Sequence, residues 1–79
     1  MKLSVYSLKK ILFQGEAQLL NCKTMMGEIT VLNNHQTLIG VLTKGVMKIV
    51  DTAKAEHFLE ITSGFLEVCS NNEVRCIVE

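Results

Sequence analysis

Hydrophobic and polar residues alternate along most of the chain, in short runs with the spacing of β-strands. Leu3 and Val5 are flanked by polar residues, and Met47 and Ile49 follow the same spacing further along. Because successive side chains of a strand point to opposite faces, this spacing predicts strands that are buried on one face. Other shared faces are Leu59 and Ile61 in HFLEIT, Leu66 and Val68 in GFLEVCS, and Val74, Cys76 and Val78 in EVRCIVE.

Turn-forming residues separate these runs in a chain that contains no proline. The breaks are Gly15, Met26-Gly27, Asn33-Asn34, Lys44-Gly45, Asp51 to Glu56, Ser63-Gly64 and Asn71-Asn72. Their spacing is close to the roughly 8–12 residues typical of an all-β sandwich or barrel, and the gaps are too short for crossover helices. The pattern therefore predicts one all-β domain over residues 1–79, built mainly from antiparallel hairpins.

Two segments have partly helical features. The leucines and the isoleucine have a partly helical spacing in the segment LKKILFQGEAQLL, although Gly15 makes a long helix there less favourable. TAKAEHFLEI contains good helix formers, and we interpret it as a loop that leads into a strand.

Five residues are expected to shape turns. Gly27, Gly45 and Gly64 each stand directly before an apolar run, where a positive φ or a close chain approach would exclude a Cβ atom. Asn33 and Asn34 suit turns and left-handed backbone conformations. We expect these residues to have structural roles.

Composition limits the classes of function. A chain of 79 residues buries only about 60% of the surface that it exposes when unfolded, so a stabilising partner is expected. Eight basic residues balance eight acidic ones, which argues against nucleic acid and against direct binding to an anionic membrane. No apolar run approaches the roughly 20 residues of a spanning helix, and the N-terminus lacks the apolar region of a signal peptide. We expect a soluble protein on the cytoplasmic side.

The three cysteines do not indicate a disulfide framework or a zinc site, because their number is odd and no CxxC pair occurs. In a hairpin turning at Asn71-Asn72, Cys69 would face Val74, with Cys76 on the same side but one diagonal away. That separation of about 7–8 Å is long for a disulfide. We therefore predict free thiols, no metal and no cofactor.

Candidate catalytic groups are isolated in the sequence. His35, Glu28 and Glu67 could act as an acid or a base, but no motif of a nucleophile, a metal site or a phosphate loop accompanies them. A histidine beside asparagine in a polar corner usually satisfies local backbone groups. A small hydrolase using His35 and Glu28 is the least favoured of the functions considered.

The run TLIGVL places apolar residues on both faces of one strand. One explanation is a central strand that is buried on both sides, and the other is an apolar surface that contacts another protein. The sequence leaves both open.

Several segments, in this order, resemble one known family. The segments are VYSLKKILFQGEA, GEITVLNNH, LTKGVMKI and SGFLEVCSNN. Together they resemble the N-terminal β-sandwich domain of the epsilon subunit of F-type ATP synthases, which is called delta in mitochondria. The resemblance covers essentially all 79 residues. It implies a flattened antiparallel β-sandwich of about ten short strands.

The resemblance also implies a non-catalytic subunit at the foot of the rotating central stalk. Such a subunit binds the gamma subunit and contacts the polar loops of the c-ring, coupling proton or sodium flow to ATP synthesis or hydrolysis. It would lie peripherally at the cytoplasmic face of the energy-transducing membrane, which it would contact only through the complex. By position, the c-ring residues are Ser7, Met26, Gly27 and Glu28, and the gamma residues are His35 and Thr43.

The chain departs from the family pattern at three places. LNNHQT replaces the usual L-P-G-H-x-P corner, Ser63-Gly64 replaces Gly-Gly, and Thr30 stands at a usual glycine. Asparagine in place of glycine keeps access to the left-handed region, whereas each lost proline costs about 0.4–1 kcal/mol through the unfolded state.

The chain ends at Glu79, where family members continue into a C-terminal helical hairpin. No helical pattern supplies that hairpin, so we expect either a naturally short subunit without the inhibitory arm or a piece of a longer chain. A free-standing β-sandwich that binds a ligand or self-associates is the alternative function.

Overall fold

The computed structural model describes residues 1–79 as eight β-strands without a helix, which confirms the all-β prediction. The strands are β1 (Lys2–Tyr6), β2 (Ile11–Thr24), β3 (Gly27–Leu32), β4 (Leu38–Leu42), β5 (Gly45–Asp51), β6 (Glu56–Ile61), β7 (Gly64–Cys69) and β8 (Glu73–Val78). Neither segment with partly helical features forms a helix: the first lies mostly in β2, and the second consists of a turn followed by β6. No helix is present that could cross a membrane.

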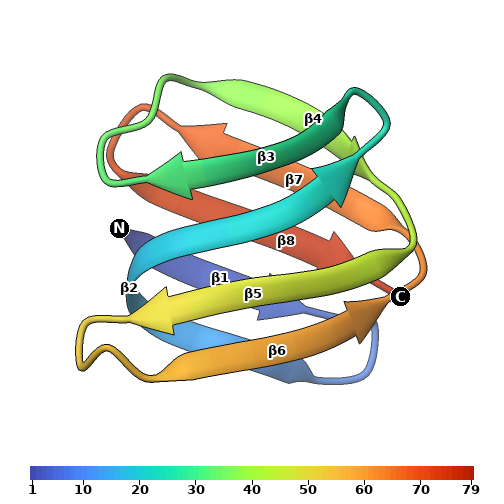
Figure 1. Cartoon of the computed structure of the whole chain (residues 1–79), viewed down its shortest axis with the longest axis horizontal. Helices are drawn as coiled ribbons and strands as arrows, with labels where there is room; N and C mark the ends of the chain where they lie inside the picture. The colour runs from blue at the N-terminus through green and yellow to red at the C-terminus, as the bar shows by residue number, and fades with distance from the viewer.

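The strands form two layers that face each other (Figure 1). One layer contains β1, β8, β7 and β4, and the other contains β3, β2, β5 and β6. β2 connects the layers, because its first part pairs with β1 and its second part pairs with β3 and β5. The predicted break at Gly15 is wrong, since Gly15 lies inside β2 and pairs with Leu3. This continuity is one reason why the chain has eight strands where about ten were expected.

The strand pairs are antiparallel, as predicted, with one exception. β1 and β8 run parallel, with Leu3 opposite Val74 and Val5 opposite Cys76. A parallel pair needs a long connection between its strands. Here the connection is the rest of the sandwich, because β1 and β8 are the first and last strands, so no crossover helix is required.

The register of the β7–β8 hairpin differs from the predicted one. Cys69 pairs with Glu73 rather than with Val74, so the turn holds three residues, 70–72, and Asn72 adopts a left-handed φ of 58°. A three-residue hairpin loop commonly ends on such a residue. Cys76 consequently points into the core, whereas Cys69 lies on the other face, and the predicted placement of both on one side is wrong.

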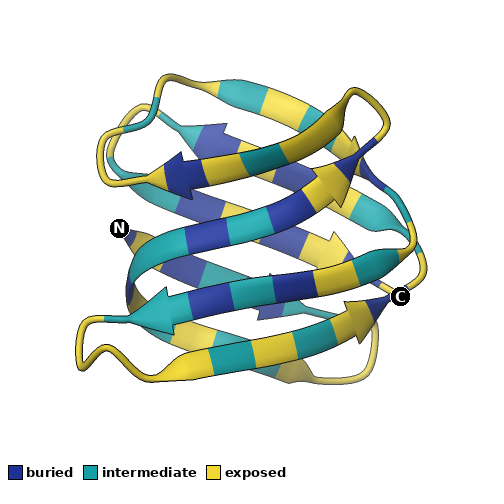
Figure 2. Cartoon of the chain, in the orientation of Figure 1, coloured by how far each residue is buried: buried dark blue, intermediate teal, exposed yellow.

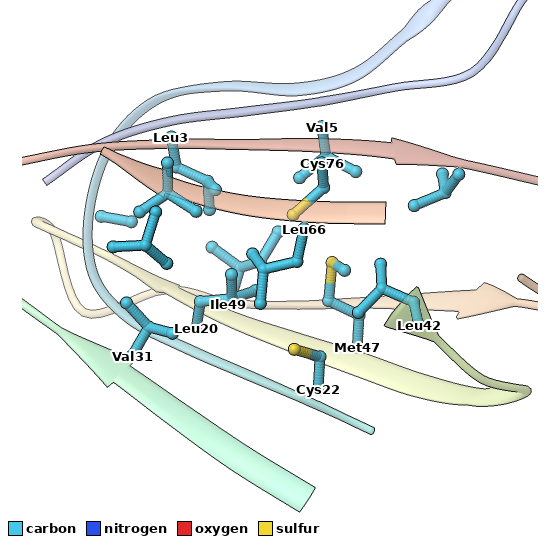
Figure 3. Packing of buried hydrophobic residues seen from close by; sticks show 14 of the residues in the cluster. Leu3, Val5, Leu20, Cys22, Val31, Leu42, Met47, Ile49, Leu66 and Cys76 are labelled. Atoms are coloured by element: carbon cyan, nitrogen blue, oxygen red, sulfur yellow. The ribbon is translucent and has the colours of Figure 1, made fainter. Parts of the chain in front are cut away.

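The core lies between the two layers (Figure 3). Buried residues alternate with half-buried or exposed ones along β1, β5, β7 and β8, as the sequence pattern predicted (Figure 2). The fully buried side chains include Leu3, Val5, Leu20, Cys22, Met47, Ile49, Leu66 and Cys76. Burial of this apolar surface is the main contribution to stability in a fold without disulfides.

Candidate functional site

The outer face of the layer formed by β1, β8, β7 and β4 exposes large apolar side chains. We call this surface the apolar face and define it by Ile39 and Val41 of β4, Phe65 of β7, Ile77 of β8, Tyr6 of β1 and the adjoining Leu8. Ile39 is 79% exposed and Phe65 is 60% exposed. Apolar side chains gathered in this way on a surface commonly mark a protein–protein contact.

Strand register places most of the apolar face in one row. Val41 pairs with Phe65, Phe65 with Ile77, and Ile77 with Tyr6, so four neighbouring strands each contribute one side chain. Directly paired residues on one face have Cβ atoms only about 4.5–5.5 Å apart. The row is therefore a continuous apolar surface.

The apolar face decides between the two explanations of TLIGVL. Leu38 and Leu42 pack toward the core, whereas Ile39 and Val41 point outward and remain exposed. The first explanation, a central strand buried on both sides, is therefore wrong within the 79-residue chain. Phe65 and Ile77 were not among the residues predicted to bind a partner, although both are apolar at positions that a one-sided strand usually gives to polar residues.

Two shallow hollows lie beside Phe65 and Ile77. One, of about 360 Å³, is also lined by Leu8, Ser63, Gly64 and Glu79. The other, of about 310 Å³, is also lined by Ile39, Glu67 and Arg75. The apolar face is therefore a ridge with a depression on each side, a shape that side chains of a partner can enter.

Charged groups border the second hollow. Arg75 Nη1 lies 3.3 Å from Glu67 Oε1, and Nη2 lies 3.5 Å from Glu73 Oε2. Glu73 and, less strongly, Glu67 raise the pKa of Arg75. Exposed ion pairs of this kind add little to folding stability, so these charges matter more for the choice of partner.

The segments expected at the c-ring lie at one end of the sandwich, with the β1–β2 connection on one side of that end and the β2–β3 turn on the other (Figure 1). Met26 belongs to the turn between β2 and β3, and Gly27 and Glu28 are the first residues of β3. The buried Thr24 holds this turn, because its hydroxyl accepts a bond from Met26 N at 3.1 Å and donates one to Gly27 O at 2.8 Å. Ser7 lies in the β1–β2 connection at the same end (Figure 1).

The two residues expected at gamma are separated by the length of β4. Thr43 follows β4 and donates from its backbone N–H to Lys23 O at 3.0 Å, beside the β2–β3 turn. His35 precedes β4 at the opposite end, with Nδ1 2.8 Å from Gln36 O. β4 carries Ile39 and Val41 of the apolar face between them.

The structure does not assemble an acid–base site. Glu28 lies near the start of β3, whereas His35 lies beyond its end, and the Glu28 carboxylate instead accepts a hydrogen bond from Asn21 Nδ2 at 3.1 Å. A hydrolase that uses both residues is therefore excluded by their separation. No group of three or more His, Cys, Asp or Glu side chains gathers to hold a metal ion.

One titratable pair supports a turn. His57 Nε2 lies 2.9 Å from Asp51 Oδ2, and the ring of His57 contacts Phe13 edge-on with centroids 5.1 Å apart. The hydrogen bond from His57, followed by that from the Ala55 N–H, lowers the pKa of Asp51. These contacts stabilise the β5–β6 turn away from the apolar face.

The whole chain, residues 1–79, matches the family described as ATP synthase, Delta/Epsilon chain, beta-sandwich domain. Its relatives include the ATP synthase epsilon chains of Desulfosudis oleivorans, 32% identical over 68 residues, and Clostridium novyi, 33% identical over 67 residues. These alignments cover 86% and 85% of this chain but 51% of each relative, so the chain spans about half their length.

Solved structures show the same fold. A chain from the Euglena gracilis mitochondrial ATP synthase, in an OSCP/F1/c-ring structure, superposes with a TM-score of 0.92 at 19% identity, covering 99% of this chain and 49% of that one. A chain from the central stalk and c-ring of the Tetrahymena thermophila mitochondrial enzyme superposes with a TM-score of 0.86, also at 19% identity, covering 99% and 62%. From the match over all of its residues, the chain belongs to the ATP synthase delta/epsilon chain β-sandwich family.

Proposed function

We propose that this chain is a non-catalytic part of the central stalk of a proton- or sodium-translocating F-type ATP synthase. The apolar face binds the gamma subunit, and the end formed by Ser7, Met26, Gly27 and Glu28 contacts polar loops of the c-ring. The chain thereby helps to couple ion flow to ATP synthesis or hydrolysis. It meets the membrane only through the complex, on the cytoplasmic face.

The observation that carries this proposal is the exposed apolar face on a member of this family. Because β4 lies between His35 and Thr43, a gamma subunit covering Ile39 and Val41 could contact both of the residues assigned to it. A stalk subunit must hold gamma and ring at once, and here the proposed ring contact lies at an end of the sandwich while the apolar face lies on its side.

Co-expression of the chain with the gamma subunit of the same synthase tests the proposal. We expect a complex that survives size-exclusion chromatography, and we expect that complex to bind the isolated c-ring. A chain that elutes without gamma, either alone or as a self-associated species, would overturn the proposal in favour of a free-standing module.

A further inference from the structure

We infer that the segment seated on the apolar face is an amphipathic α-helix of gamma, running along β7 and β8 with a basic side chain near each end of its apolar stripe. This inference rests on the proposed function, because gamma is the partner. It adds the kind of element that binds and the charges that position it.

The partner contacts side chains rather than extending the sheet. β7 pairs with β4 and β8, and β8 pairs with β7 and β1, so neither of these strands has a free edge. β4 keeps a largely open edge, since only its Leu42 pairs with β2, but the residues shared by both hollows, Phe65 and Ile77, lie on β7 and β8. Adding a strand requires an exposed edge. A helix satisfies its own backbone hydrogen bonds and needs only an apolar surface for its stripe.

The two hollows define the direction of the helix. Both include Phe65 and Ile77, but one extends toward Gly64 and Glu79 and the other toward Glu67 and Arg75, so they follow one another along β7 and β8. Two residues of a strand span about 6.8 Å, and helix residues four apart rise about 6 Å. Side chains at i and i+4 of a helix can therefore enter one hollow each.

Acidic side chains border both hollows. Glu79 lines the first, and Glu67 lines the second, where Glu67 and Glu73 share the single guanidinium of Arg75. Lys2 pairs across the strands with Glu73 on the same face, so the three carboxylates exceed the two basic groups by one, which favours a partner with positive charge. Arg75 pairs with Glu67, and four residue steps of extended chain, about 14 Å, separate Arg75 from Glu79. Two basic residues about 7 to 11 positions apart on one helix face would therefore reach Glu67 at one end and Glu79 at the other.

Photo-crosslinking tests the element that binds. p-Benzoylphenylalanine replaces Phe65, and the control replaces Phe58, which is also 60% exposed but lies in the other layer. In the complex with gamma, we expect the crosslinker at Phe65 to label one helical segment with an apolar stripe, and the control to leave that segment unlabelled. Crosslinks from Phe65 to a strand or loop of gamma, or equal labelling from both positions, would overturn the inference while leaving the proposed function standing.

Neutral variants test the charges. We expect Glu67→Gln and Glu79→Gln each to weaken binding to gamma by about two- to fivefold and to reduce its salt dependence. Glu56→Gln is the matched control, because Glu56 is 52% exposed and ion-paired as Glu67 is, but it pairs with Lys48 in the other layer. Unchanged affinity and salt dependence in both Glu67→Gln and Glu79→Gln would overturn the charge pattern, and no binding by the wild-type chain would overturn the proposed function as well.

Discussion

Gly64, at the start of β7, occupies a position with no room for a side chain. Its φ is +155°, and an added Cβ atom would lie 2.3 Å from Ile77 O and 3.0 Å from Val78 Cα. Both neighbouring atoms belong to the backbone of β8, so the β7–β8 hairpin would have to open to make room for a Cβ atom at Gly64. The close approach of β7 and β8 at this point also supports one end of the apolar face.

We expect Gly64→Ala to lower the free energy of unfolding by about 2–4 kcal/mol, measured by urea denaturation. Gly40→Ala is the control, because a Cβ atom there would meet only side chains at ordinary contact distances of 3.7 Å or more. A small change, within about 1 kcal/mol, is expected for the control. Equal effects of the two substitutions would show that the contact with Ile77 O is unimportant.

Two of the three thiols are enclosed in the core and act as small apolar side chains. Cys22 and Cys76 are fully buried, whereas Cys69 is partly exposed. Burial raises the pKa of Cys22 from 9.0 to about 11 and, together with the neighbouring Cys22, raises the pKa of Cys76 from 9.0 to about 12.

These raised pKa values predict a loss of stability at alkaline pH. The thiols of the unfolded chain ionise from about pH 9, whereas those of the folded chain stay protonated to pH 11 or 12, so the stabilisation is complete below pH 9 and decreases as the pH rises. We expect the unfolding free energy of Cys76→Ala to fall less between pH 8 and pH 11 than that of the wild type, by an amount on the order of 2 kcal/mol. Parallel pH profiles for the two proteins would contradict this assignment.

The proline-free corner between β3 and β4 is held by contacts from other elements. Asn34 adopts a left-handed φ of 60°, and its N–H donates to Asn72 Oδ1 at 2.8 Å. Asn33 Oδ1 accepts a hydrogen bond from the amino group of Met1. The corner is therefore tied both to the β7–β8 turn and to the beginning of β1, which offsets the absence of the prolines usual in the family.

Asn72→Gly isolates the contribution of that cross-turn bond. Glycine accepts the left-handed conformation of Asn72 but removes the acceptor, so we expect a loss of about 0.5–1.5 kcal/mol in urea denaturation. Asn72→Asp keeps an acceptor oxygen and should retain most of the stability. If Asn72→Asp is as destabilised as Asn72→Gly, the bond to Asn34 does not hold the corner.

The faces of most strands could be predicted from the sequence, because residues such as Leu66, Val68 and Val78 are apolar at a strict spacing of two. The continuity of β2 could not, since Gly15 reads as a break but pairs with Leu3 across the ladder. The third residue of the β7–β8 turn could not be predicted either, because the pair Asn71-Asn72 by itself suits a two-residue turn. Long-range pairing determined both outcomes.

The candidate site was only partly predictable. Ser7, Met26, Gly27 and Glu28 lie at one end of the molecule, and their assignment to the ring stays a prediction. The apolar face, in contrast, forms only when four strands from both ends of the sequence pair side by side. No local pattern shows that Phe65 will lie between Val41 and Ile77.

On the scale of the whole molecule, two surfaces point in different directions. The apolar face lies on the outer side of the layer formed by β1, β8, β7 and β4. The β2–β3 turn lies at an end of the sandwich (Figure 1). A domain of this size gains stability from covering exposed apolar surface, whereas polar turns remain available for a second contact. The fold is thus suited to join two partners.

The proposed ring contact can be separated from folding at Glu28. This side chain is exposed and makes one hydrogen bond, to Asn21, so Glu28→Ala should change the unfolding free energy by only about 0.5 kcal/mol. We expect the variant to bind gamma normally but to weaken ATP-driven ion pumping in the reconstituted synthase. A strongly destabilised variant would show that Glu28 supports the fold instead, and a stable, fully coupled variant would remove it from the ring contact.

The most direct test of the account is the affinity for gamma, measured by isothermal titration calorimetry for the wild type, Phe65→Ser and Phe58→Ser. Both phenylalanines are 60% exposed, so neither substitution should unfold the chain, and they differ in the layer to which they belong. We expect Phe65→Ser to weaken binding at least about tenfold, because it removes a central apolar contact, and Phe58→Ser to change it less than about twofold. Equal affinities of Phe65→Ser and the wild type would contradict the claim that the apolar face binds gamma.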